Sequence, residues 1–118
     1  MIRTNVGSSE DLLRELSAWV RMETPTHDAA AVNRLMDVAE GELARAGADI
    51  ARIPGRDGFG DNLVARTPGE GPPILVAGHL DTVWSHGTLD AMPYAVNGDK
   101  AHGPGIYDMK AGSFLAFH

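Results

Sequence analysis

A short run of apolar residues near the middle of the chain, Ile74-Leu75-Val76-Ala77, limits the possible folds more than any other segment. The run does not alternate between apolar and polar residues, so both faces of an extended chain would be apolar. A strand of this kind is typical of the centre of a sheet that helices cover on both faces. We therefore predict a strand from Ile74 to Gly78 and an α/β fold.

Helical and extended patterns on either side of this run agree with that fold class. Apolar residues recur at helical spacing over two segments, with Gly47 at the expected end of the second. Gly and Pro divide the rest into short strands, and Asn97-Gly98 predicts a hairpin turn. The predicted helices are 9–22, 29–46 and one starting at Met109, and the other strands are 49–53, 62–66, 94–96 and 99–101. Helices and strands in this order indicate a single α/β domain.

Composition excludes several classes of function. The 118 residues carry ten basic and sixteen acidic side chains, a net charge of -6 that argues against nucleic acid and anionic membrane surfaces as partners. The chain has no apolar run near the ~20 residues needed to cross a bilayer, so we expect a soluble, cytoplasmic protein. It also has no cysteine. Any metal must therefore be held by His, Asp, Glu or backbone oxygen.

A histidine and an aspartate follow the predicted central strand, in the positions where open α/β sheets bind their ligands. His79 and Asp81 are two residues apart, so in an extended chain their side chains point the same way. An imidazole can bind a metal through one nitrogen while a carboxylate accepts the N–H of the other. A hydrogen-bonded structural pair is the alternative, and for an isolated His-x-Asp it is the more frequent one.

A second aspartate follows a glycine-rich turn. Gly103, Pro104 and Gly105 indicate a tight turn that delivers Asp108 just before the third predicted helix. Asp108 could be the N-cap of that helix. It could equally be a metal-bridging carboxylate, which needs a closely approaching backbone and a neighbouring ligand such as His79.

Taken together, the two segments resemble the metal motifs of a known enzyme family. Gly78 to Val83 resembles the first motif, and residues 103–112, reading GPGIYDMKAG, resemble the second. The family is that of the zinc exopeptidases and deacylases, which includes glutamate carboxypeptidase, acetylornithine deacetylase and succinyl-diaminopimelate desuccinylase. The resemblance covers nearly the whole chain, and HLDTVW with Gly87-Thr88 and Pro93 is most similar to the glutamate carboxypeptidase branch.

The resemblance implies a role for each of these residues. His79 would be a terminal ligand of one of two zinc ions, and Asp81 would be the catalytic residue that orients it. Asp108 would bridge the two ions, and the peptide bond from Asp108 to Met109 would be cis. Cobalt or manganese would be possible substitutes for zinc. The reaction would be hydrolysis of an amide bond in a small peptide or N-acyl amino acid.

The resemblance also implies an architecture. The family's catalytic domain has three α/β/α layers with a mixed sheet, and residues 1–118 would be its truncated N-terminal part, without the smaller dimerisation (lid) domain. The general-base glutamate and the remaining ligands would lie beyond His118. We therefore expect this chain alone to be inactive and to bind zinc weakly.

Two alternatives stay open at this stage. One is a non-catalytic domain that keeps the fold and associates with other copies through an exposed sheet edge. The other is an unrelated α/β domain in which the motif residues are structural. Four further histidines are expected to have surface or supporting roles: His27 in a polar turn, His86 and His102 near the motifs, and His118. Lys110 is interpreted either as part of the family motif or as an exposed lysine in a first helical turn.

Overall fold

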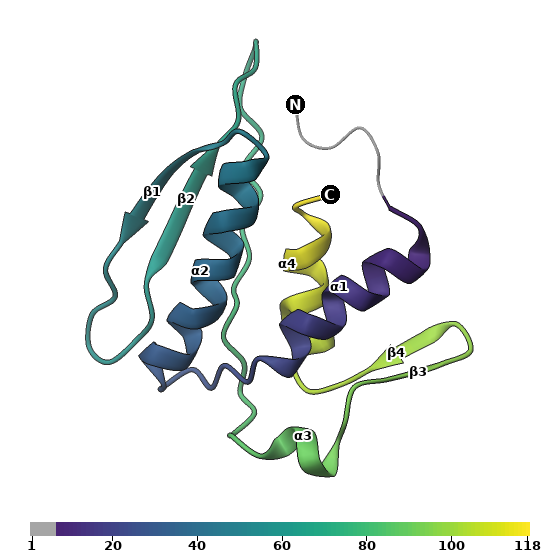
Figure 1. Cartoon of the computed structure of the whole chain (residues 1–118). Helices are drawn as coiled ribbons and strands as arrows, with labels where there is room; N and C mark the ends of the chain where they lie inside the picture. The colour runs from purple at the N-terminus through teal and green to yellow at the C-terminus, as the bar shows by residue number, and fades with distance from the viewer. Residues whose placement is uncertain (1–6) are drawn as a thin grey trace.

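The computed structural model of the protein describes residues 7–118 (Figure 1). In this range the elements are, in chain order, α1 (Ser9–Arg21), α2 (Ala29–Arg45), β1 (Asp49–Ile53), β2 (Asn62–Arg66), α3 (Thr88–Ala91), β3 (Ala95–Asn97), β4 (Lys100–His102), the π-helical turn η1 (Ile106–Lys110) and α4 (Ala111–Leu115). The two N-terminal helices, the strands at 49–53 and 62–66 and the C-terminal hairpin are confirmed. The predicted third helix begins at Ala111, two residues later than expected.

Local capping sets the ends of the two long helices. Ser8 and Asp11 form a reciprocal capping box at the start of α1. Asp28 caps α2 by accepting a hydrogen bond from the backbone N–H of Ala31 at 2.9 Å. After α2, Gly47 adopts a φ of +84°, a conformation that favours glycine at a helix end.

The hydrophobic core lies where α1, α2 and α4 meet. Trp19 is 2% exposed, and its ring packs in T-shaped arrangements with the rings of Phe114 and Phe117, at centroid distances of 5.4 and 5.3 Å. Leu35 of α2 is completely buried in the same cluster. Leu80, from the first motif, also belongs to it, so the core reaches directly to the predicted site.

The strands form two separate antiparallel hairpins. β1 pairs with β2 from Asp49–Arg66 to Ile53–Asn62, and β3 pairs with β4. The second hairpin turns at Gly98 and Asp99, one residue later than predicted, because Asn97 pairs with Lys100 and Gly98 takes the positive φ of +62°.

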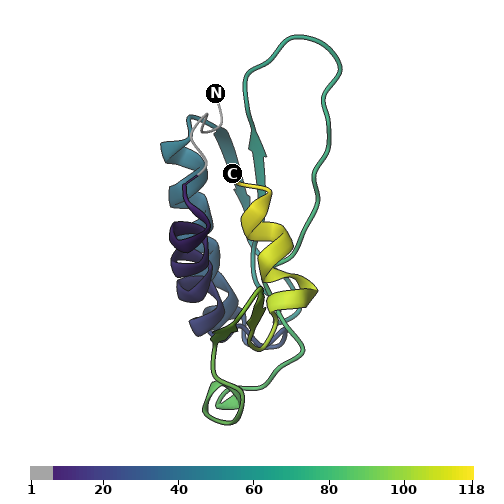
Figure 2. The same cartoon turned by 90° about the vertical axis from the view of Figure 1, so that its right-hand side faces the viewer.

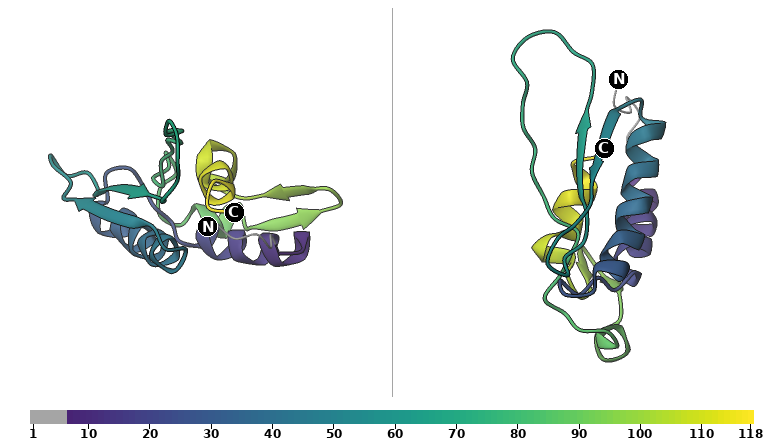
Figure 3. Two further views of the ribbon diagram at one scale, coloured as in Figure 1. Left: turned by 90° about the horizontal axis from the view of Figure 1, so that it is seen from above. Right: turned by 90° about the vertical axis from the view of Figure 1, so that its left-hand side faces the viewer.

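Helices lie on both sides of these hairpins. In Figure 2 and Figure 3, α1 and α2 cover one side and α4 lies on the other. This arrangement is compatible with the α/β class. A three-layer domain with a mixed sheet is not confirmed, because both sheets are antiparallel and parallel pairing in the described residues is limited to an isolated bridge between Pro25 and Thr82.

The prediction of a central strand from Ile74 to Gly78 is wrong for this structure. The segment has no strand assignment, and Ile74, Leu75 and Val76 are 90%, 89% and 68% exposed. A strand needs a hydrogen-bonded neighbour, and this segment pairs with neither hairpin in the described part of the chain. It runs instead along one side of an open groove of about 550 Å³, which β2, α2 and α4 also line.

Among residues 7–118, no helix has both the length and the apolar character to span a membrane.

Replacing Leu35 with alanine is expected to lower the free energy of unfolding by about 2–5 kcal/mol, because the side chain is completely buried and its removal leaves a cavity. Urea unfolding followed by circular dichroism measures the change. Val38→Ala, on the exposed face of the same helix, is the matched control and is expected to change stability by less than about 0.5 kcal/mol. Equal losses in the two variants would contradict the assigned core.

Candidate metal centre

The turn between α1 and α2 holds the first motif in place. Thr24 donates its hydroxyl to the carbonyl of Leu80 at 2.7 Å and accepts the N–H of Thr82 at 2.8 Å through its own carbonyl. The N–H of Thr26 donates to the carbonyl of Thr82 at 3.0 Å. Because Thr24 and Thr82 are both buried, these bonds are shielded from water. The backbone around His79 and Asp81 is therefore fixed by this turn rather than by a neighbouring strand.

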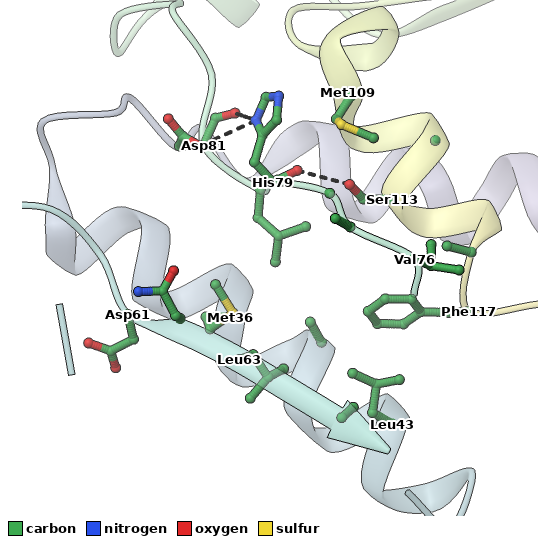
Figure 4. Close-up of a pocket in the computed structure, with 18 of the residues that line it drawn as sticks. Met36, Leu43, Asp61, Leu63, Val76, His79, Asp81, Met109, Ser113 and Phe117 are labelled. Atoms are coloured by element: carbon green, nitrogen blue, oxygen red, sulfur yellow. Dashed lines mark hydrogen bonds and ion pairs between the residues drawn. The ribbon is translucent and has the colours of Figure 1, made fainter. Parts of the chain in front are cut away.

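His79 is oriented from two directions. Its Nδ1 lies 3.0 Å from the Asp81 carbonyl oxygen and 3.2 Å from the Asp81 carboxylate (Figure 4). Both partners are acceptors, so Nδ1 carries the proton in this contact. On the backbone side, the hydroxyl of Ser113 donates to the His79 carbonyl at 2.9 Å. Gly78 permits this approach, because a Cβ there would lie 2.7 Å from the Ser113 hydroxyl oxygen.

Asp81 is held by a second hydroxyl. Thr26 donates to Oδ2 of Asp81 at 2.6 Å, while Oδ1 is the oxygen that faces His79. The carboxylate therefore links the α1–α2 turn to the histidine ring.

Asp108 reaches His79 from the second motif. Its Oδ1 lies 3.0 Å from Nε2 of His79, and its side chain is 77% exposed. The predicted cis bond from Asp108 to Met109 is confirmed. Gly105 takes a φ of +74° and lies so close to the side chain of Thr82 that a Cβ would overlap it, which explains the glycine.

The N-cap interpretation of Asp108 is wrong. The residue before α4 is Lys110, and no side chain caps that helix. The carboxylate of Asp108 instead contacts His79, which lies 29 positions earlier in the chain. The structure thus brings together the two motif residues that the sequence separates.

Contacts with the two aspartates set the protonation of His79. Partial burial by itself lowers the pKa of the imidazole, but the hydrogen bond to Asp81 and the carboxylate of Asp108 outweigh burial and raise the pKa above its ordinary value. The protonated ring is favoured because it can donate to both aspartates at once.

Lys110 is a buried residue whose burial the sequence did not predict. Its interpretation as an exposed lysine is wrong, since only 1% of the residue is exposed. Its ammonium donates to the carbonyls of Trp19 at 3.2 Å and Met22 at 2.5 Å, at the end of α1. Burial lowers the pKa of Lys110 to about 8, and the negative charge of Glu23 opposes part of that effect. No local pattern distinguishes this lysine from a surface one.

The remaining histidines have other partners. His86 lies 2.7 Å from Asp28, beside Glu23, whose pKa is lowered by hydrogen bonds from the N–H groups of Gly87 and Leu89. His27 and His102 are exposed. The side chain of His118 is only 5% exposed, so a surface role for it is wrong; its Nδ1 lies 3.1 Å from the Phe114 carbonyl.

The described residues do not form a complete metal site. Within positions 7–118, no group of three or more His, Asp or Glu side chains is arranged to hold a metal ion. His79 and Asp108 supply two donor atoms that face each other, and Asp81 stands behind the histidine. The arrangement is therefore one part of a possible centre.

A scan against models of protein families finds no match. Among curated proteins, the chain is similar to carboxypeptidase G2 of Pseudomonas sp. (strain RS-16), with 36% identity over 109 residues, which is 91% of this chain and 26% of that protein. It is also similar to succinyl-diaminopimelate desuccinylase of Methylobacterium sp. (strain 4-46), with 39% identity over 83 residues, which is 61% of this chain and 20% of that protein. The chain belongs to the zinc exopeptidase and deacylase family. It spans about a quarter or less of the length of these relatives.

Family membership removes one alternative. Two relatives with aligned sequence over most of the chain are not compatible with an unrelated α/β domain, so that interpretation is wrong. Both relatives carry the names of hydrolases, a carboxypeptidase and a desuccinylase. The family to which the chain belongs therefore includes hydrolases of both kinds.

We expect the pKa of His79 in the metal-free chain to lie above its ordinary value of 6.5, and Asp108→Asn to lower it by removing a carboxylate that favours the protonated ring. NMR titration of the ring protons measures both values. Since the folded-state pKa is above the unfolded one, protonated His79 stabilises the fold at pH below the unfolded pKa. This contribution is lost as pH rises through the folded pKa.

Asp90→Asn, which changes an exposed carboxylate of α3, is the control and should leave the titration of His79 unchanged. An unshifted pKa in the parent chain, or no response to Asp108→Asn, would contradict the geometry described above.

Proposed function

We propose that this chain supplies some of the ligands of a dinuclear zinc site in a hydrolase. The hydrolase would cleave amide bonds of small peptides or N-acyl amino acids, as a glutamate carboxypeptidase does. The names of the two relatives, a carboxypeptidase and a desuccinylase, support hydrolysis of this general kind. The choice between peptides and N-acyl amino acids belongs to the proposal.

The contact between Nε2 of His79 and Oδ1 of Asp108, at 3.0 Å, is the observation that carries this proposal. Nδ1 of the same ring already donates to Asp81, so a neutral ring turns the lone pair of Nε2 toward a carboxylate. Two acceptors at this distance repel each other unless a cation lies between them. A proton meets that need in the metal-free chain, and a metal ion meets it in a metal centre.

The donor set fits zinc. An imidazole nitrogen and a carboxylate oxygen are ligands that zinc takes in catalytic sites, and the chain has no cysteine to offer instead. A metal-binding histidine typically donates a hydrogen bond from its other ring N–H to a carbonyl or carboxylate oxygen. Asp81 places both kinds of oxygen near Nδ1 of His79. The residues present therefore suit part of a zinc site.

In this proposal each residue has one task. His79 binds a zinc ion through Nε2, Asp81 holds the ring in the required tautomer, and Asp108 bridges two ions. Thr26 keeps the carboxylate of Asp81 turned toward the ring by its 2.6 Å hydrogen bond. Bound zinc would polarise the amide carbonyl and make a water molecule more acidic. Cobalt and manganese are the expected substitutes.

The proposal requires further ligands and a glutamate base from outside these 118 residues. A catalytic zinc takes about three protein ligands, whereas His79 and Asp108 are the two candidates that face each other here. The chain aligns with only 26% and 20% of the two relatives, so most of their length lies outside the aligned region, which supports this requirement. We infer that the 118-residue chain alone binds zinc weakly and does not turn over substrate.

Zinc titration of the purified chain by calorimetry tests the ligands. We expect weak binding that falls at least about tenfold in His79→Ala and in Asp108→Ala, because each change removes a donor atom. His102→Ala changes an exposed histidine outside the site and is expected to bind as the parent chain does. Binding that survives both site substitutions would exclude this pair as ligands.

Activity assays test the incompleteness of the site. We expect no zinc-dependent hydrolysis of dipeptides or N-acyl amino acids by the purified chain, because the proposed base is not among its residues. Chromatographic detection of released amino acid measures the rate. Robust hydrolysis that follows the zinc concentration and disappears in His79→Ala would show that this chain needs no further catalytic residue.

Association of copies through an exposed sheet edge stays a prediction. We propose that the exposed apolar segment 74–76, which belongs to neither sheet of the described residues, takes part in it. We expect oligomers at high concentration by light scattering and a shift to monomer in Ile74→Lys. Val83→Lys, at an equally exposed apolar position, is the control. A monomer at every concentration would contradict the prediction. Neither the contacts of residues 7–118 nor the two relatives favour the alternative of a non-catalytic interaction domain.

A further inference from the structure

A buried ammonium group lies two residues after Asp108. Lys110 is 1% exposed, and its Nζ donates to two carbonyls at the C-terminal end of α1, those of Trp19 in the last turn and of the C-cap residue Met22. The carbonyls at the end of a helix have no partner within the helix and carry a partial negative charge. Lys110 therefore caps α1 from a distant part of the chain.

Burying this cation opposes folding, so its position needs a reason. A charge taken out of water is costly unless strong partners replace the lost hydration. Here the partners of Lys110 are neutral carbonyls, and Glu23 acts on the ammonium through its charge and not through a hydrogen bond. An apolar side chain of similar length would fill the same space at a lower cost.

The position of Lys110 determines where the second motif can lie. Its backbone N–H donates to the carbonyl of Gly105 at 2.9 Å, which closes the turn that contains Asp108. Its ammonium then ties the end of this turn to α1. The Asp108 side chain is 77% exposed and contacts His79, so the backbone of this turn decides where its carboxylate lies.

Three residues after Lys110, Ser113 holds the backbone of His79 in the first motif. Its hydroxyl binds the carbonyl of His79 at 2.9 Å. The segment from Lys110 to Ser113 thus touches α1 through the ammonium and the first motif through the hydroxyl. A shift of this segment would change the separation between His79 and Asp108.

We propose that Lys110 is a positioning residue for the metal centre: its ammonium, bound to the carbonyl end of α1, holds the Gly105–Lys110 turn so that the Asp108 carboxylate meets His79. This inference rests on the proposed function. It assigns Lys110 no contact with substrate or metal.

The test compares Lys110→Met, which keeps the length of the side chain but removes its donors, with Phe114→Leu as a control for general loss of packing. Phe114 is 1% exposed and lies in the same helical segment, where its side chain belongs to the hydrophobic core. In the described residues, the side-chain hydrogen bonds of Asp108 and His79 do not involve it. Both variants are studied well below their unfolding temperatures. If Lys110→Met does not fold, Lys110→Gln, which keeps a shorter donor, takes its place.

Two measurements separate positioning from stability. In the metal-free chain, NMR detects the nuclear Overhauser effect between the His79 ring and the β-protons of Asp108. In the metal-bound chain, titration with zinc, and with cobalt for its visible spectrum, reports affinity and ligand geometry. We expect Lys110→Met to lose the proton contact, to bind zinc about tenfold or more weakly and to alter the cobalt spectrum. Phe114→Leu should retain all three properties.

Three outcomes test whether Lys110 positions Asp108. An unchanged proton contact in the lysine variant overturns the inference, whatever happens to stability. So does an equal loss in Phe114→Leu, because the effect would then be one of packing. If the parent chain binds no zinc, the proposed function fails, while the proton contact still decides whether Lys110 positions Asp108.

Discussion

The hydrogen bonds between the α1–α2 turn and the first motif fix the backbone on which the candidate site depends. Thr24 and Thr26 bind Leu80, Asp81 and Thr82 through main-chain and hydroxyl groups. Through them the core under α1 and α2 is joined to the backbone that carries His79. A motif that stood on a free loop would spread its histidine over many orientations, at a considerable cost in conformational entropy on binding a metal. Here that entropy is lost during folding instead.

The candidate site is arranged around the contact between an imidazole nitrogen and a carboxylate oxygen. Nε2 of His79 and the carboxylate of Asp108 face each other, and the raised pKa of the histidine is the response of the metal-free chain to that arrangement. The ammonium of Lys110 does not take part in this contact, because it is directed at the carbonyl end of α1. The buried ammonium thus lies apart from the contact between His79 and Asp108 that the proposed function assigns to a metal.

Local patterns predicted much of the fold. The helix ends follow from Ser8, Asp28 and Gly47, and the short hairpin follows from Gly98, all of which act on neighbours within a few residues. The central strand failed for the opposite reason. Its apolar run predicted burial on both faces, but burial and strand pairing require partners elsewhere in the fold, and the described chain leaves Ile74 to Val76 exposed beside the groove.

The sequence by itself determined the chemical identity of the candidate site: an imidazole, two carboxylates and glycines at spacings that resemble a zinc hydrolase family to which the comparisons assign the chain. Only the tertiary structure decided which oxygen of Asp81 faces the ring, that Thr26 and Ser113 support the site, and that Lys110 is buried under α1. The physical reason is that donor types and turn propensities are properties of short segments. The distance between His79 and Asp108 depends instead on how helices far apart in the chain pack together.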